Sequence, residues 1–249
     1  GDWVPLYEGK MIQAFDHRAA SVVVNPENQH RPAQPEPATL EQHRDPSWLP
    51  APQYWVLEEE CKWSAEPGWV LGFKEITAPT NVRTFIAALL PTVAFGNKVP
   101  LLLREGETSE EWLLAANLNS IPFDYVTRQK VQGQTLNLFI VEQLPVILPE
   151  RFYDTKFGSS SAAELLRDIV LELTYTAQDM TPFARDMGYT DDSGNVLPPF
   201  GWDEERPSSF ISTASRIATM SVMSILPFQL SSGWRRKLMM VATARANYV

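Results

Sequence analysis

The chain has 249 residues, of which 44% are hydrophobic and 11% aromatic, and this is enough to build a substantial core. Its formal net charge of −9 argues against bulk electrostatic attraction to nucleic acid, so any nucleic-acid site must be a local patch. The single Cys61 excludes an internal disulfide, and three histidines within the first 43 residues are a poor set of metal ligands, so no metal site is predicted.

No apolar run approaches the roughly 20 residues that a membrane-spanning helix needs. The first residues, "GDWVPLYEG", lack the basic-then-apolar order of a signal peptide. We therefore expect a cytoplasmic protein without a membrane partner.

The first 148 residues predict an α+β domain with a mixed, curved sheet and packed helices. Strands are expected in "VPLYEG", at 21–24, in "YWVLEEE", in "GWVLGFKEIT", near 84–90 and 99–103, and at 136–141. Alternation in the fourth of these places Trp69, Leu71 and Phe73 on one face.

Two helices are expected between the later strands of this domain. Thr108 and Glu111 have the spacing of a capping box, which starts a helix that ends near Leu118. Pro122 fits the first turn of a second helix, over 123–128. The segment 25–52 holds seven prolines and little apolar periodicity, which predicts a long surface loop without regular structure.

Residues 149–206 predict a helical region. Ser161 and Glu164 form a second capping box, and an apolar stripe from Leu165 to Leu173 follows it. From residue 207 the composition changes, because residues 207–249 contain no acidic residue and carry +5, whereas residues 1–206 carry −14. We interpret this atypical tail as a frame-shifted reading or a disordered segment.

The sequence contains no recognisable catalytic motif. There is no glycine-rich phosphate loop, G-x-S-x-G elbow, H-E-x-x-H or Cys-x-x-Cys pair, so no catalytic residue is assigned. Asp16 beside His17 has the composition of a base with its orienting carboxylate. Neighbouring residues of a strand point to opposite faces, however, and no nucleophile is identified, so a structural role is favoured.

Two polar loops lie between apolar elements. In "LNSIPFDYVTRQKVQGQTLNLFIVEQLPV", cationic and amide side chains gather around Gly133; in "FKEITAPTNVRTF", others crowd the connection between two strands. Arg and Lys contact guanine or phosphate and Gln and Asn contact adenine, so these loops have the donors that DNA recognition uses. Ordinary solvated connections have the same composition, and composition does not decide between the two.

The runs "PLYEGKMIQAFDHR", "GWVLGFKEITAPTNVRTFIAALLP" and "LNSIPFDYVTRQKVQGQTLNLFIVEQLPV" resemble the C-terminal target-recognition region of adenine-specific DNA methyltransferases and restriction-modification enzymes. The nearest group is the Eco57I-like and BREX- or DISARM-type methylases, whose specificity region is similar to those of TaqI methyltransferase and type I specificity subunits. "ELTYTAQDMTPFARDMGY" and "PPFGWDEER" resemble the helical segment that follows in these proteins.

This resemblance implies a prokaryotic module that selects the sequence of double-stranded DNA and is not itself an enzyme. A separate N-terminal domain of the parent protein, absent here, would bind S-adenosylmethionine and methylate adenine N6, so no cofactor is expected in this fragment. The loops and the resemblance together give these DNA-contact candidates: Lys10, His17, Arg18, Lys74, Asn81, Arg83, Arg128, Gln129, Lys130, Gln134 and Thr135.

The match to the family pattern also includes Gly9 and Gly133, and Asp16, Thr84 and Asn137, for which a structural role is equally expected. A protein-interaction module is the alternative function. In that case the stripe from Leu165 to Leu173 docks a partner subunit of the same system and the polar loops are incidental.

Overall fold

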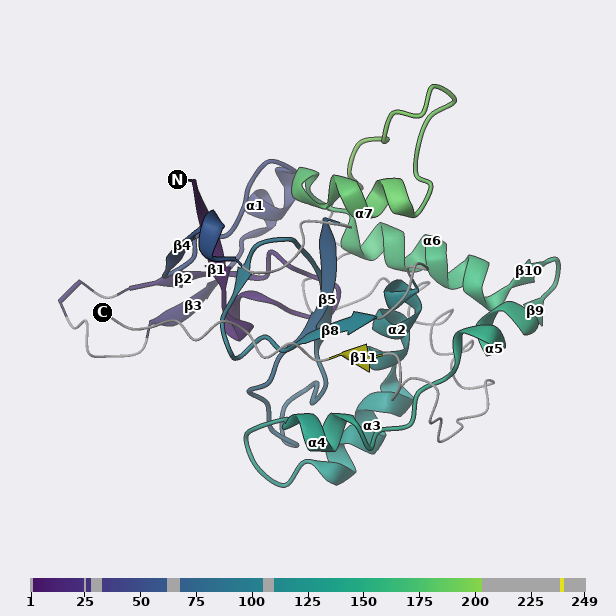
Figure 1. Ribbon diagram of the computed structural model, residues 1–249, viewed down its shortest axis with the longest axis horizontal. Helices are drawn as coiled ribbons and strands as arrows, with labels where there is room; N and C mark the ends of the chain where they lie inside the picture. The colour runs from purple at the N-terminus through teal and green to yellow at the C-terminus, as the bar shows by residue number, and fades with distance from the viewer. Residues whose placement is uncertain are drawn as a thin grey trace.

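The central strand, β5 (Trp69–Phe73), is buried along its whole length in a computed structural model that describes residues 2–24, 26–27, 33–61, 68–104, 110–202 and 238–239. It pairs antiparallel with β6 (Ala87–Pro91) and β8 (Leu101–Arg104), and the short β11 (Leu238–Met239) pairs with the outer edge of β8. The chain is therefore an α+β protein, as the sequence predicts (Figure 1).

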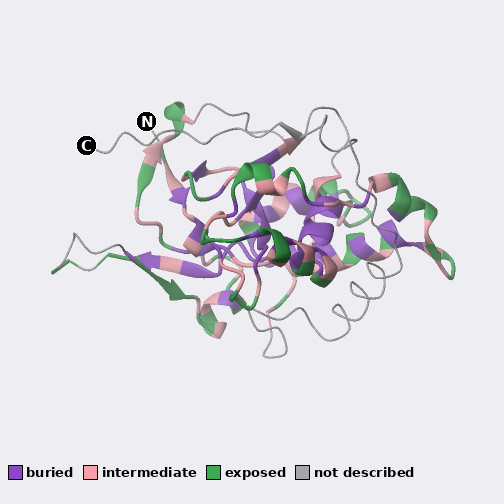
Figure 2. Cartoon of the chain, turned by 90° about the horizontal axis from the view of Figure 1, so that it is seen from below, coloured by how far each residue is buried: buried purple, intermediate pink, exposed green. Residues whose placement is uncertain are grey.

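The two faces of this sheet belong to two hydrophobic clusters. Trp69, Leu71 and Phe73 lie in the larger cluster, which confirms the predicted alternation, and Val70 lies in the smaller one. Helix α2 (Glu111–Leu118) packs on the large-cluster face, and buried residues gather between the sheet and the helices (Figure 2). Burial on both faces explains why β5 is a nearly continuous apolar run.

The amino-terminal strands build the second side of the molecule. β1 (Trp3–Tyr7) lies between β4 (Trp55–Leu57), which is antiparallel to it, and β7 (Ala94–Phe95), which is parallel. Tyr7 and Phe95 both belong to the smaller cluster. Short 3-10 turns complete this part and the carboxy-terminal half: Gly9–Met11, Glu58–Glu60 and Gln178–Met180.

The proline-rich segment 25–52 does contain regular structure, contrary to the prediction. β3 (Gln34–Pro37) pairs antiparallel with β2 (Ala20–Val23), where its prolines are tolerated because β3 has no described strand on its other side. Helix α1 (Leu40–Arg44) follows, with Thr39 as its N-cap in a reciprocal capping box. The prediction failed because proline count says nothing about pairing with a distant strand.

Helix α3 (Ile121–Lys130) confirms the second predicted helix. Ser120 is its N-cap, with the hydroxyl accepting a hydrogen bond from the amide of Phe123, and Pro122 lies in the first turn. Helix α2 begins later than predicted, at Glu111 with Glu110 as N-cap, and the predicted N-cap Thr108 lies outside the described residues.

The predicted strand 136–141 is wrong. The Leu136 amide donates to the carbonyl of Glu75 at 2.8 Å, and its side chain is fully buried, but the chain then turns into the short helix α4 (Leu138–Val141). A short apolar run does not distinguish a strand from a buried helical turn, and here tertiary contacts decided the outcome.

The carboxy-terminal half consists mainly of helices, as predicted: α5 (Pro149–Asp154), the β9 (Lys156–Phe157) and β10 (Ser160–Ser161) hairpin, α6 (Ala162–Thr174) and α7 (Thr181–Asp186). Ser161 and Glu164 form the predicted capping box of α6. Trp69 donates its indole N–H to Asp186 at 2.7 Å and meets the ring of Phe183 edge-on. The predicted boundary at residue 148 therefore does not separate two cores.

The predicted atypical tail, residues 207–249, lies outside the described residues except for β11. Nothing in the described structure tests its interpretation as a frame-shifted or disordered segment. Among the described helices, none combines the length and hydrophobicity needed to cross a membrane.

Candidate functional site

The two polar loops predicted from the sequence lie side by side. Ile76 and Thr135 form an isolated antiparallel bridge, and the amide of Thr77 donates to the carbonyl of Gln134 at 3.1 Å. These main-chain bonds join the connection after β5 to the connection after α3. We call the joined segments the paired loops, residues 74–84 and 128–137.

The paired loops expose several amide and cationic side chains. Asn81, Gln129, Lys130 and Gln134 are all exposed, and within the described part of the chain their side chains make no hydrogen bond or ion pair. Thr135 beside them is half-buried. The free donors and acceptors are therefore available to a ligand, which buried and satisfied groups are not.

The paired loops are locally cationic in an acidic protein. They contain four cations, Lys74, Arg83, Arg128 and Lys130, of which Arg128 is paired with Asp124 outside the loops, against the one carboxylate of Glu75. That carboxylate already lies 2.9 Å from the ammonium of Lys98. The chain as a whole carries −9, so the positive charge is concentrated where the exposed amides are.

Arg128 is an anchor of the paired loops, contrary to its predicted place as the first DNA contact. Its guanidinium donates to the carbonyls of Pro79 at 2.9 Å and Val82 at 3.0 Å, and it pairs with Asp124 at 2.8 Å. Arg83 is likewise used internally, because it donates to the carbonyl of Asn119 at 2.6 Å. Both arginines hold the loop and are withdrawn as primary DNA contacts.

Asp124, which the sequence analysis did not select, completes this anchor. Its buried carboxylate accepts hydrogen bonds from the amides of Thr84 at 2.7 Å and Phe85 at 2.8 Å, through the oxygen that Arg128 does not use. The signal was present, because Asp124 and Arg128 are four residues apart on one helix. Thr84 itself is fully buried, which supports its structural role.

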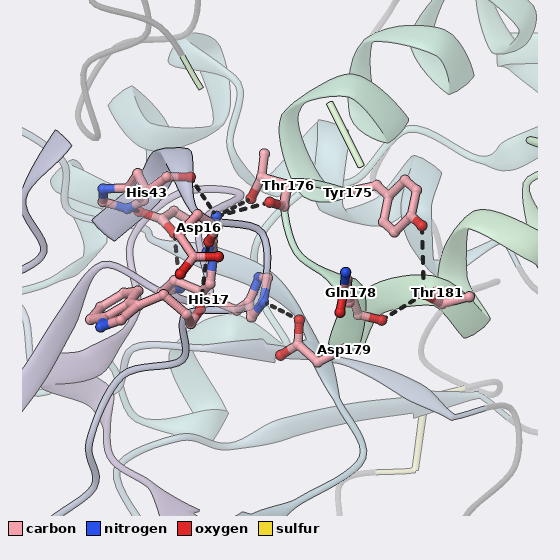
Figure 3. Close-up of polar contacts among 11 residues, drawn as sticks. Asp16, His17, His43, Tyr175, Thr176, Gln178, Asp179 and Thr181 are labelled. Carbon is pink, nitrogen blue, oxygen red and sulfur yellow. Dashed lines mark hydrogen bonds and ion pairs between the residues drawn. The ribbon is translucent and has the colours of Figure 1, made fainter. Parts of the chain in front are cut away.

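Arg18 is not part of the paired loops and is fully buried, so it cannot contact DNA in this structure. Its guanidinium donates to the main-chain carbonyls of His43, Asp45, Trp48 and Thr176 at 2.8–3.0 Å (Figure 3). Burial lowers the pKa of this guanidinium. The prediction failed because the same donors that fit phosphate also fit a cluster of carbonyls.

His17 is also a buried structural residue. Its Nε2 lies 3.0 Å from the carboxylate of Asp179, and the Nε2 of His43 lies 3.2 Å from that of Asp16 (Figure 3). Burial raises the pKa of Asp179, but His17 and then Arg18 outweigh it, and the pKa ends below its ordinary value. The neighbours Asp16 and His17 therefore pair with two different partners, and neither reaches a substrate.

The two remaining candidates differ in their surroundings. Lys10 is tied internally, because its ammonium donates to the carbonyl of Ala33 at 3.0 Å and pairs with Glu8 at 3.2 Å. Lys74 is half-buried at the end of β5, and burial lowers the pKa of its ammonium. No other described group forms an ion pair with it, so Lys74 remains a candidate and Lys10 does not.

The two glycines of the family pattern have different environments. A Cβ at Gly9 would lie 2.8 Å from the carbonyl oxygen of Lys98, so this position requires glycine for packing. A Cβ at Gly133 would meet nothing within 4 Å. Gly133 is therefore an open surface position.

The described residues contain no group of three His, Cys, Asp or Glu side chains that could hold a metal ion. In comparisons with known proteins, no family model, curated protein or solved structure matches the chain. A functional conclusion therefore depends on the geometry of the paired loops and on the resemblance of the sequence motifs.

Proposed function

We propose that this chain is the DNA-recognition module of an adenine-N6 DNA methyltransferase that acts in a restriction-modification or phage-defence system. The observation that carries this proposal is the joining of two distant polar loops into one exposed surface that is cationic and rich in amides. Such a surface offers both kinds of contact that sequence recognition needs, to phosphates and to base edges.

The contacts divide by chemistry. Lys130 and Lys74 neutralise phosphate, whereas Gln129, Gln134 and Asn81 have the paired donor and acceptor that match adenine in the major groove. The frame behind them is rigid, because the loops are joined to buried elements by main-chain bonds and by Arg128. Recognition loops held by a rigid scaffold are common at binding sites.

In this proposal the fold is a specificity domain of the TaqI and type I kind, and methyl transfer takes place in a separate cytoplasmic part of the enzyme. That part binds S-adenosylmethionine and the flipped adenine, because bases must leave the stack to be methylated. The present chain supplies position along the DNA and no catalytic residue.

A protein-interaction function through the predicted apolar stripe is not favoured by the structure. Leu166, Val170 and Leu171 of α6 are buried in the core of this same chain, and Leu173 packs against it. Leu165 and Ile169 of the stripe are half-buried, so its inner side packs against α2 and the neighbouring helices and its outer edge stays accessible.

The test is to replace Lys130 with alanine and measure binding of the whole chain to labelled duplex DNA over a range of salt concentrations. Loss of one phosphate contact lowers the slope of log affinity against log salt by about 0.9, and it weakens binding to all sequences alike. Lys156→Ala is the matched control, because Lys156 is an equally exposed lysine on β9.

Equal salt slopes for wild type and Lys130→Ala would remove Lys130 from the DNA interface. Electrostatic binding to DNA is strong at low salt, about 50 mM. Failure of the whole chain to bind duplex DNA under that condition would reject the proposed function.

A further inference from the structure

The tip of the first paired loop, residues Thr80–Val82, is highly exposed, although hydrogen bonds hold its backbone in place. Val82 is 91% exposed, the largest value among the large hydrophobic residues described. Thr80 and Asn81 beside it are also exposed. A valine gains nothing from this position in the free protein, because its methyl groups contact water and not the core.

The stem of this loop is closed by hydrogen bonds on both sides of the tip. The amide of Asn81 donates to the carbonyl of Ala78 at 3.1 Å, and the hydroxyl of Thr77 donates to the carbonyl of Thr84 at 2.6 Å. The hydroxyl of Thr84 in turn donates to the carbonyl of Ala78 at 3.3 Å. The loop is therefore cross-linked within itself at its base.

Helix α3 then fixes the loop from outside. Arg128 donates to the carbonyls of Pro79 before the tip and Val82 within it, and Asp124 binds both this arginine and the main-chain amide of Thr84 after the tip. A loop held on both sides loses little conformational entropy when it binds, which is the advantage of preorganisation.

The chemistry of the tip matches one base pair in the major groove. The carboxamide of Asn81 can donate to adenine N7 and accept from adenine N6–H, and the methyl groups of Val82 can contact the C5-methyl of thymine. The minor groove offers neither the thymine methyl nor the paired adenine groups. The tip is uncharged, so it adds sequence information and not general affinity.

We propose that the tip Thr80–Val82 enters the major groove and reads an A·T pair, with Asn81 on adenine and Val82 on the thymine methyl. Arg128 is a positioning residue that holds the tip and does not contact DNA. This inference rests on the proposed function and adds to it the base pair and the residues that read it.

The experiment begins by selecting the preferred duplex for the whole 249-residue chain from a random library at low salt. Each A·T pair of the selected site is then altered singly, with uracil in place of thymine to delete only the methyl group, or 7-deazaadenine to delete only N7. Affinities are measured for wild type, Asn81→Ala and Val82→Ala.

At one pair, uracil weakens wild-type binding by about fourfold, the value of one buried methyl group. The same uracil has no further effect on Val82→Ala, because the partner methyl groups are gone. At that pair or its neighbour, Asn81→Ala weakens binding by about tenfold, and 7-deazaadenine then adds nothing. Val24→Ala and Gln178→Ala are controls, being an exposed valine and an exposed carboxamide outside the paired loops.

Arg128→Ala tests the positioning role through two quantities that a change in stability alone does not alter. We expect the variant to bind thymine and uracil sites equally, while the slope of log affinity against log salt for non-specific DNA stays that of the wild type. A slope lowered by about 0.9 would instead identify Arg128 as a phosphate contact and overturn its assigned role.

The outcomes separate the two proposals. A selected site whose modified A·T pairs affect wild type, Asn81→Ala and Val82→Ala equally overturns the reading role of the tip and leaves the proposed function in place. A chain that selects no sequence overturns the proposed function, and the inference about the tip with it.

Discussion

Two arginines of this chain bind its own main-chain carbonyls. Arg18 and Arg128 were both predicted to contact DNA, and both donate to main-chain carbonyls. A guanidinium has five donors in a planar fork, which suits phosphate, guanine and clusters of carbonyls alike. The residue type therefore predicted the hydrogen bonding but not the acceptor, which only the folded chain defines.

Arg18→Lys should lower the free energy of unfolding by about 3 kcal/mol, because an ammonium cannot span the carbonyls on both arms of the fork and leaves buried acceptors without donors. The melting temperature of the whole chain, followed by circular dichroism, should fall by about 8 °C. Arg167→Lys is the control, because Arg167 is exposed and pairs with the exposed Asp168 beside it. A fall below about 2 °C would show that the carbonyl cluster does not depend on the guanidinium.

At the scale of elements, α3 is a brace between the sheet and the paired loops. Its residues Asp124 and Arg128 lie on the same side of the helix and together bind the segment from Pro79 to Phe85. The N-cap Ser120 and the early Pro122 define where this helix begins. They therefore also define which part of the loop the side chains of Asp124 and Arg128 contact.

Asp124→Ala should lower the free energy of unfolding by about 3 kcal/mol, because it leaves two buried amides without an acceptor and Arg128 without its carboxylate. Urea denaturation measures the change. Asp124→Asn, which keeps one oxygen for the amides, should lose clearly less. Asp168→Ala, an exposed partner of Arg167, should change stability by less than about 0.5 kcal/mol. Equal losses for the alanine and asparagine variants would contradict the role assigned to the amides.

Elements with a long internal pattern could be predicted from the sequence. The alternation of β5 and the capped, amphipathic α6 were both correctly predicted, because each carries enough residues to define a period. β3 and α4 were missed because their conformation depends on partners elsewhere in the chain, such as β2 and the carbonyl of Glu75, which the local pattern does not show. The polar loops were found by composition, but their contact with each other depends on tertiary pairing.

For the whole molecule, the buried polar cluster around Arg18 joins the beginning of the chain to its helical half. His17 reaches Asp179, and Arg18 reaches Thr176, both beyond the predicted boundary at residue 148. The large hydrophobic cluster also contains residues from both sides of that boundary, such as Phe73 and Val170. The described parts of both regions should therefore unfold together.

This connection gives the stability of the whole molecule a defined dependence on pH. The pKa of Asp179 lies below its ordinary value of 3.8, so its ionised form stabilises the folded state above that pH. This contribution is lost as the pH falls through the lowered pKa in the folded state. Asp179→Asn should therefore be less stable than wild type at pH 7, and it should lose less stability as the pH falls below about 4, where carboxylates begin to be protonated.

The melting temperatures of wild type and Asp179→Asn, measured between about pH 2.5 and about pH 7, show this difference, because carboxylates titrate in roughly this range. Asp192→Asn is the control, because Asp192 is exposed and should leave the acid dependence of the wild type unchanged. Parallel curves for wild type and Asp179→Asn would show that this carboxylate does not link the two halves.

The bonds that close the stem of the first paired loop have a consequence for how new specificities arise. Arg128 and Asp124 grip the backbone at Pro79, Val82, Thr84 and Phe85, and a backbone carbonyl or amide is the same whatever side chain it carries. Substitutions at positions 80–82 therefore leave these hydrogen bonds to the loop backbone intact. The same scaffold can therefore present different side chains to DNA, and substitutions at these positions can change the recognised sequence without destabilising the fold.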